Sequence, residues 1–189
     1  MSQGLFERAA ALACRDRLLI SAASGYATPV SELPDKLSAI AEAVHALSSA
    51  GVPYALIGGL AVGIRSGVPR ATLDVHLAVL SSADRPRLIT HFKAQGFALV
   101  GEFPHSINFK HPSGEPVQLA FDPSFDPMIA RAEPIAVADL SLSVVTTADL
   151  IEMKRRAAAD PGRRRSKALR DQADIALLEG DIPGPDEGW

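Results

Sequence analysis

The stretch YALIGGLAVGIRSGVPRATLDVHLAVL, Tyr54 to Leu80, constrains the fold more than any other part of the sequence. An apolar run of strand length meets the pair Gly58 and Gly59, a short helical pattern follows, and a second strand pattern carries Asp74 and His76. Because side chains alternate along a strand, these two residues share one face with Thr72. The order predicts a sheet with helices packed against it, and a carboxylate on an otherwise apolar strand needs a reason.

The composition is that of a folded protein with one domain and a small helical appendage. The chain has 189 residues, of which 47% are hydrophobic and 22% charged, and a net charge of −3. This charge gives no overall attraction to nucleic acid or to an anionic membrane, so such a contact would need a local basic patch. The single cysteine, Cys14, excludes an internal disulfide, and we expect a buried structural thiol in a reducing compartment.

The beginning of the sequence does not resemble a signal peptide. Charged residues interrupt its apolar residues, and no window reaches the ~18 uncharged apolar residues that a membrane-spanning helix needs. We therefore expect a cytoplasmic protein with no membrane partner.

Periodicity and breakers predict the remaining elements. Helices are predicted at 5–22, 35–51, 81–96, 146–160 and 163–180, and strands at 54–57, 72–80, 97–103, 106–112 and 115–122. The last helix is expected to present Leu169, Ala173, Ala176 and Leu177 on one face. The predicted fold class is α/β (α+β), a mixed sheet flanked by helices with helical N- and C-terminal segments. We divide the chain into an N-terminal helix and loop (1–34), a core (35–145), and a C-terminal helical pair with a tail packed on that core (146–189).

The ordered set Gly58-Gly59, Arg70-x-Thr72-x-Asp74 and the late Leu-Ile-x-x-Lys with Asp171 and Asp174 resembles the nucleotidyltransferase superfamily, and most of all the minimal nucleotidyltransferases and AbiEii-type toxins. The resemblance runs from about residue 37 to 178. It implies a mixed sheet of the nucleotidyltransferase type, a nucleoside triphosphate as ligand and a divalent metal, Mg²⁺ or Mn²⁺.

The resemblance also implies roles for individual residues. It assigns nucleotide binding to Gly58, Gly59, Arg70, Thr72 and Lys154. The physical argument agrees for the glycines, because they let the backbone approach a triphosphate and the next helix points its N–H groups at that anion. From spacing alone, tight packing between strand and helix explains the two glycines equally well.

The sequence departs from the family pattern at the metal site. Nucleotidyl transfer uses two divalent ions held by carboxylates, and Mg²⁺ prefers oxygen ligands that carry negative charge. Asp74 stands at the first carboxylate position, but His76 stands at the second and Gln118 at the third. Asp74 and His76 would form a weak site for Mn²⁺ or Zn²⁺, and a hydrogen bond between them is the simpler expectation. Asp122 and Asp126 are expected to lie too far along the chain to substitute.

Three hypotheses for the function remain open. The first is a nucleotidyltransferase-fold protein with a degenerate site that binds a nucleotide or a regulatory partner without transferring anything. The second is an active, divergent enzyme that moves a nucleoside monophosphate onto RNA, a protein or a small molecule. The third is a toxin-like component that depends on an antitoxin. The basic run after Lys154 could bind phosphates of a nucleotide or of RNA, or form a solvated face.

Overall fold

The computed structural model describes residues 35–70, 72–137, 140–182 and 184. The helix predicted at 5–22 and Cys14 lie outside this part of the chain. The elements are, in order, α2 (Lys36–Ser49), β1 (Tyr54–Ile57), α3 (Gly58–Ser66), β2 (Val75–Val79), α4 (Arg85–Ala94), β3 (Ala98–Phe103), β4 (Ser106–Lys110), β5 (Pro116–Ala120), the 3-10 helix η2 (Pro123–Phe125), α5 (Asp126–Ala130), β6 (Glu133–Val137), β7 (Leu140–Val144), α6 (Thr147–Ala159) and α7 (Arg165–Leu178).

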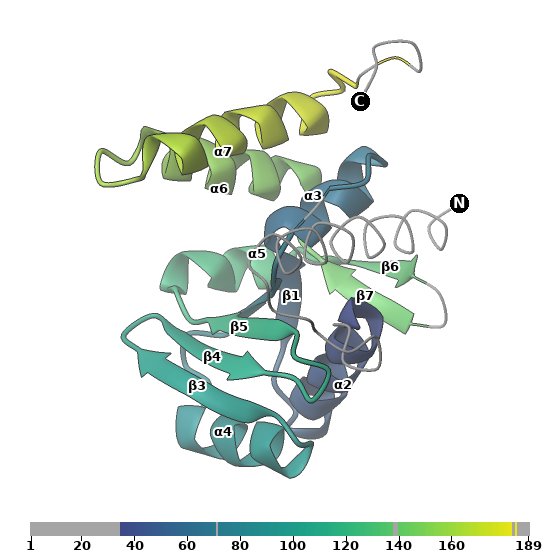
Figure 1. The fold of residues 1–189 in the computed structure, drawn as a ribbon, viewed down its shortest axis with the longest axis vertical. Helices are drawn as coiled ribbons and strands as arrows, with labels where there is room; N and C mark the ends of the chain where they lie inside the picture. Colours follow the sequence, from purple (N-terminus) through teal and green to yellow (C-terminus); the bar gives the residue numbers. More distant parts are fainter. Residues whose placement is uncertain (1–34, 71, 138–139, 183, 185–189) are drawn as a thin grey trace, which may run out of the picture.

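Within the described ranges, seven strands form one mixed sheet in the order β3-β4-β5-β2-β1-β7-β6 (Figure 1). Strands β1 and β2 are antiparallel, whereas β2 pairs with β5, and β1 with β7, in parallel. The strands predicted at 72–80 and 115–122 are expected to be neighbours in the sheet. This prediction is confirmed, since His76 of β2 lies opposite Gln118 of β5. The predicted fold class, a mixed sheet flanked by helices, is confirmed as well.

One face of the sheet forms the core with α2 and α4. Alternate residues of the central strands, such as Leu77 and Phe109, are fully buried on this face. Phe92 of α4 stacks on Phe109 with ring centroids 4.6 Å apart. The apolar stripe of α2 is buried in the same core. The opposite face carries the polar side chains His76, Gln118 and Asn108 of β2, β5 and β4.

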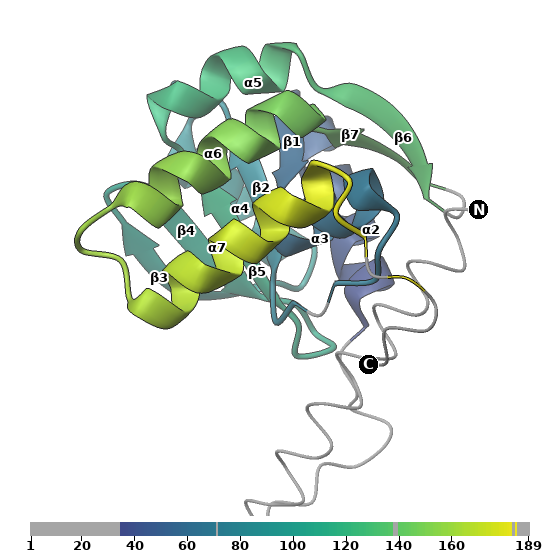
Figure 2. The ribbon, with the colours of Figure 1, turned by 90° about the horizontal axis from the view of Figure 1, so that it is seen from above.

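The other helices gather beyond that polar face. Helices α6 and α7 pack against each other and against α3, and Figure 2 shows this α6–α7 hairpin crossing above the strands. Arg65 fixes α3 to the sheet: its guanidinium donates to the carbonyl oxygens of Val144 and Val145, each at 2.9 Å, and pairs with Glu133 at 2.7 Å. None of the helices in the described part of the chain has the length and apolar character that a membrane span requires.

Several elements differ from the sequence-based predictions. The hairpin of β6 and β7 and the short helix α5 were not predicted, although the alternation in LSLSV is a strand signal. The strand predicted from Thr72 begins only at Val75. The reason is that the pairing with β1 stops at Ile57 and His76 and the pairing with β5 stops at Val75 and Val117, so the residues before Val75 have no partner in either strand.

Candidate functional site

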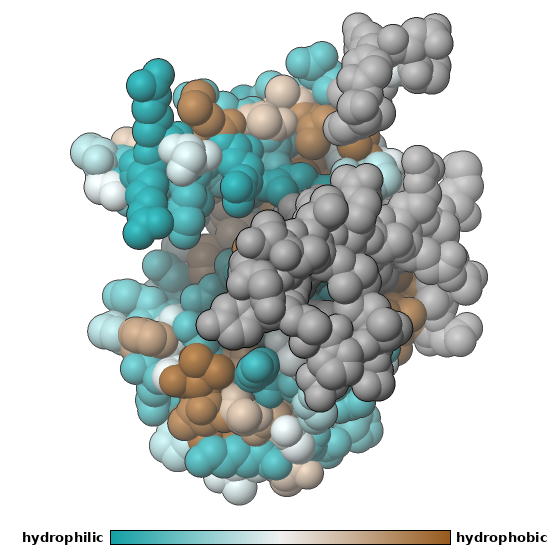
Figure 3. All heavy atoms as spheres, viewed as in Figure 1, coloured by the Kyte–Doolittle hydropathy of each residue, from teal (hydrophilic) through white to brown (hydrophobic). Residues whose placement is uncertain are grey.

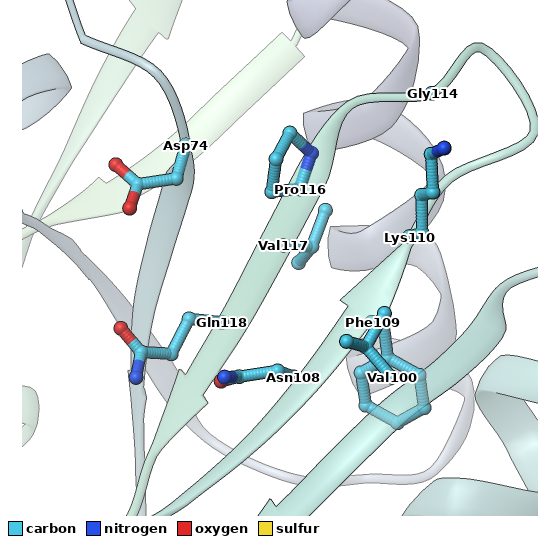
Figure 4. Close-up of a pocket in the computed structure, with 9 residues that line it drawn as sticks. All are labelled: Asp74, Val100, Asn108, Phe109, Lys110, Gly114, Pro116, Val117 and Gln118. Atoms are coloured by element: carbon cyan, nitrogen blue, oxygen red, sulfur yellow. The ribbon is translucent and has the colours of Figure 1, made fainter.

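The three residues that the resemblance places at metal-carboxylate positions lie together on the polar face of the sheet. Asp74 immediately precedes β2, His76 follows two residues later, and Gln118 faces His76 from β5. Figure 4 shows Asp74 and Gln118 on the same side of their strands, at one edge of a pocket. The parallel pairing of β2 with β5 thus places one carboxylate, one imidazole and one amide side by side.

Asp74 already has two hydrogen-bonding partners within the protein. Its Oδ2 lies 2.8 Å from Nε2 of His76, and its Oδ1 accepts a hydrogen bond from the Thr72 hydroxyl at 3.2 Å. Burial alone would raise the pKa of Asp74, but the hydrogen bonds from His76 and Thr72 and the nearby charge of Lys36 hold this pKa below its ordinary value. The carboxylate is therefore ionised at neutral pH, and both of its oxygens are hydrogen-bonded to neighbouring side chains.

The Gly58-Gly59 turn lies directly against two of these side chains. Helix α3 begins at Gly58, which has a left-handed φ of 74°. A Cβ atom on Gly58 would lie 3.2 Å from Nδ1 of His76, and one on Gly59 would lie 3.0 Å from Cβ of Thr72. Close packing against His76 and Thr72 is thus a structural reason for both glycines, beside the expected approach of a phosphate.

Arg70 and Lys154, which the resemblance assigned to nucleotide binding, are paired with carboxylates of α7. Arg70 contacts Asp174 through Nε at 2.5 Å and a terminal nitrogen at 3.2 Å. Lys154 lies 2.8 Å from Asp171 and 2.7 Å from Asp174. Arg163 completes the group at 2.5 Å from Asp171. We call these five residues the α7 ion cluster.

The α7 ion cluster corrects the prediction for the last helix. The face of α7 that packs on the protein carries Asp171, Asp174 and Leu178, whereas Leu169 is 54% exposed. The prediction of the packed face of this helix was therefore wrong. Two paired carboxylates lie on that face in place of apolar side chains. Their three-residue spacing, matched by cations elsewhere in the chain, was the available sequence signal.

The two other aspartates near the site have structural partners. Asp122 caps η2 by accepting from the backbone N–H of Ser124 at 2.8 Å. Asp126 accepts from the N–H and the hydroxyl of Ser81, at 2.9 and 2.7 Å. Within the described ranges, no three His, Cys, Asp or Glu side chains form a group that would hold a metal ion.

A pocket of about 330 Å³ opens beside Asp74 on the polar face (Figure 4). It continues from Asp74 and Gln118 across β4 to β3, where Asn108, Lys110 and Val100 line it. Sequence reasoning missed these three residues. The signal was present, since Ser106, Asn108 and Lys110 alternate as the polar side of a predicted strand.

The donor set does not fit a pair of Mg²⁺ ions. Two dications need several anionic oxygen ligands, and these positions offer one carboxylate, already hydrogen-bonded, with a neutral amide and an imidazole. We therefore derive no chemical step through a metal at this site.

Comparisons with known proteins give the fold a name. The sequence matched no protein-family model and no curated protein. Among solved structures, an antigenic nucleotidyltransferase-like protein from Paracoccidioides brasiliensis is 24% identical over 78% of each chain, with a TM-score of 0.51. The antibiotic-resistance factor ANT(2'')-Ia is 18% identical over 77% of this chain and 85% of that one, with a TM-score of 0.56.

The lincosamide antibiotic adenylyltransferase LnuA, solved with lincomycin bound, is similar too. It is 14% identical over 76% of this chain and 96% of its own, with a TM-score of 0.55. Identities at this level show a shared fold. The chain therefore has the nucleotidyltransferase fold.

Proposed function

We propose that this protein is a nucleotidyltransferase-fold binding protein that transfers no nucleotide. The observation that supports the proposal best is the set Asp74, His76 and Gln118, in which one carboxylate stands where the resemblance expects three and is already bonded to His76 at 2.8 Å. One negative charge is too little to hold two dications and a triphosphate. In this proposal the AbiEii-like resemblance reflects descent from an active enzyme, and the metal site has since lost two of its three carboxylates.

Two kinds of ligand are consistent with this proposal. A nucleotide could approach the N-terminus of α3 at the Gly58-Gly59 turn, where the helix N–H groups favour an anion. An RNA or an acidic protein could contact the exposed basic residues of the α6–α7 turn and of α7. Those that have no ion-pair partner among the residues the structure describes are Arg164, Arg165, Lys167 and Arg170. The single cysteine fits a protein of the cytoplasm.

The first test is transfer of label from each of the four α-³²P nucleoside triphosphates, with Mg²⁺ or Mn²⁺, to the protein itself or to added RNA. We expect no labelled product from the wild-type chain. Labelling that Asp74→Ala abolishes would overturn the proposal and establish an active enzyme in which His76 works as an unusual ligand.

The second test restores negative charge at the two positions where the resemblance expects metal-binding carboxylates. The double variant His76→Asp with Gln118→Asp places three carboxylates on neighbouring positions of β2 and β5. We expect Mn²⁺ to bind this variant and to raise its Tm, because the ion relieves repulsion between like charges and binds only the folded state. The control His76→Asn with Gln118→Asn keeps similar shapes without charge and should show no such increase. A wild-type Tm that rises equally with Mn²⁺ would contradict the proposal.

A further inference from the structure

A row of polar side chains crosses the open face of the sheet. His76 of β2 lies opposite Gln118 of β5, Gln118 lies opposite Asn108 of β4, and Asn108 lies opposite Gly101 of β3. Because opposite residues point to the same face, the amides of Gln118 and Asn108 stand side by side, about 5 Å apart on neighbouring strands. Figure 4 shows both amides directed toward the pocket beside Asp74.

These amides lack partners within the described part of the protein. The side-chain oxygen of Asn108 is buried and accepts no hydrogen bond. The Gln118 amide makes no hydrogen bond to any residue that the structure describes. A buried amide without a partner is destabilising by the cost of its lost water contacts, so such groups in native proteins usually meet a ligand or a bound water.

At strand β3 the row ends beside a bulge and an aromatic ring. Its pairing with β4 shifts between Leu99 and Gly101, so Val100 is an extra residue at a bulge and reaches the pocket. Gly101, opposite Asn108, has no side chain, and the ring of Phe103 takes up that place. The ring of Phe103 leans over this glycine, 3.1 Å from where its Cβ would be, and remains 51% exposed. A bulge that redirects a side chain beside a pocket is a common feature of binding sites.

We propose that this pocket binds the base of a nucleoside, with Gln118 and Asn108 hydrogen-bonded to its polar edge and Phe103 against its ring. This inference rests on the proposed function, because the pocket adjoins Asp74. A nucleobase has donors and acceptors in the plane of an apolar ring. The two planar amides supply matching acceptors and donors, and an exposed aromatic ring supplies a stacking surface.

The charges of the pocket favour an uncharged ring over an anion. Asp74 lies at one side and Lys110 at the other, two strands apart, so the pocket carries no net charge. A phosphate near Asp74 would be repelled by its carboxylate. Base binding at this place consequently needs neither a metal nor the α7 ion cluster.

Calorimetry of the full chain with adenosine, guanosine, cytidine and uridine, in the absence of divalent ions, tests the proposal. We expect at least one nucleoside to bind, and Asn108→Ala and Gln118→Ala each to weaken that binding roughly three- to tenfold, the effect of one lost hydrogen bond. Gln172→Ala removes an exposed amide on α7 and serves as the matched control with unchanged affinity. Thermal unfolding of each variant shows that it is folded.

Two outcomes would overturn the inference. One is the absence of heat with all four nucleosides. The other is binding of D-glucose that depends on Asn108, since a polyol would then be the better description of the ligand. Both outcomes are distinct from failure of the proposed function, which is measured by label transfer and not by nucleoside binding.

Discussion

At the scale of single residues, Asp74 and Asp171 show how neighbours decide the state of a carboxylate. Burial alone would raise the pKa of both, yet hydrogen bonds from His76 and Thr72 in one case, and from Lys154 and Arg163 in the other, hold both pKa values below the ordinary one. A carboxylate of this kind stabilises the folded state at pH values above its unfolded pKa. That contribution is lost as the pH falls through the folded pKa.

We therefore expect the free energy of unfolding to decrease on acidification, starting below about pH 5. Asp171→Asn should make this decrease shallower, because residue 171 no longer takes up a proton on unfolding, even though the variant is less stable at pH 7. Urea denaturation at a series of pH values measures both effects. Asp181→Asn, at an exposed position, is the control. An unchanged slope in Asp171→Asn would show that this carboxylate does not contribute.

The residue scale also shows what the sequence could reveal about the site. The positions of Asp74, His76 and Gln118 could be predicted from the sequence, because the resemblance indicates all three and strand alternation puts Asp74 and His76 on one face. The ion pairs of Arg70 and Lys154 could not be predicted in the same way, because the spacing of Asp171 and Asp174 indicates a charged helix face without saying which cations pair with it. Both are paired with Asp174 of α7, which is far along the chain from Arg70 and on the helix that follows that of Lys154, and only the packing of α7 brings the three together.

At the scale of elements, α7 is held by charge where a helix of this length usually buries apolar residues. Asp174 is 1% exposed and contacts both Arg70 and Lys154. Asp174→Asn should lower the free energy of unfolding by about 3–5 kcal/mol, because it leaves two partly buried cations without a full counter-charge. Glu179→Gln on the same helix breaks an exposed pair with Arg155 and should cost less than about 1 kcal/mol. Equal losses in the two variants, measured by urea denaturation, would contradict this account.

Elements with strong local signals were predicted from the sequence, and elements that depend on pairing across the sheet were not. Helices α2 and α6 have strong caps in Asp35 and Thr146 and were predicted almost at their observed bounds, whereas α4, predicted at 81–96, begins only at Arg85 because Asp84 is its N-cap. The hairpin of β6 and β7 was missed because Pro134 interrupts the pattern of β6, although the alternation in β7 is a strand signal. Pairing with β1 across the sheet, which is not a local property, stabilises β7.

At the scale of the whole molecule, charge is unevenly distributed. Eight basic residues and one acidic residue lie between 154 and 170, a net charge of +7 in a chain whose total is −3. Figure 3 shows a largely hydrophilic surface with several hydrophobic patches over the α6–α7 hairpin, above a hollow that separates it from the strands. The open polar face of the sheet lies below this basic hairpin, so an anionic ligand would meet the hairpin before the pocket.

The α7 ion cluster also places a limit on affinity. Any anion that uses Arg70 or Lys154 must first displace Asp174 or Asp171, so its apparent dissociation constant is the intrinsic one divided by the small fraction of molecules in which the cation is released. The ion pairs that hold α7 in place therefore use the same cations that the resemblance assigns to a triphosphate. In this protein, a more firmly attached C-terminal helix and a tighter grip on phosphate are opposing properties.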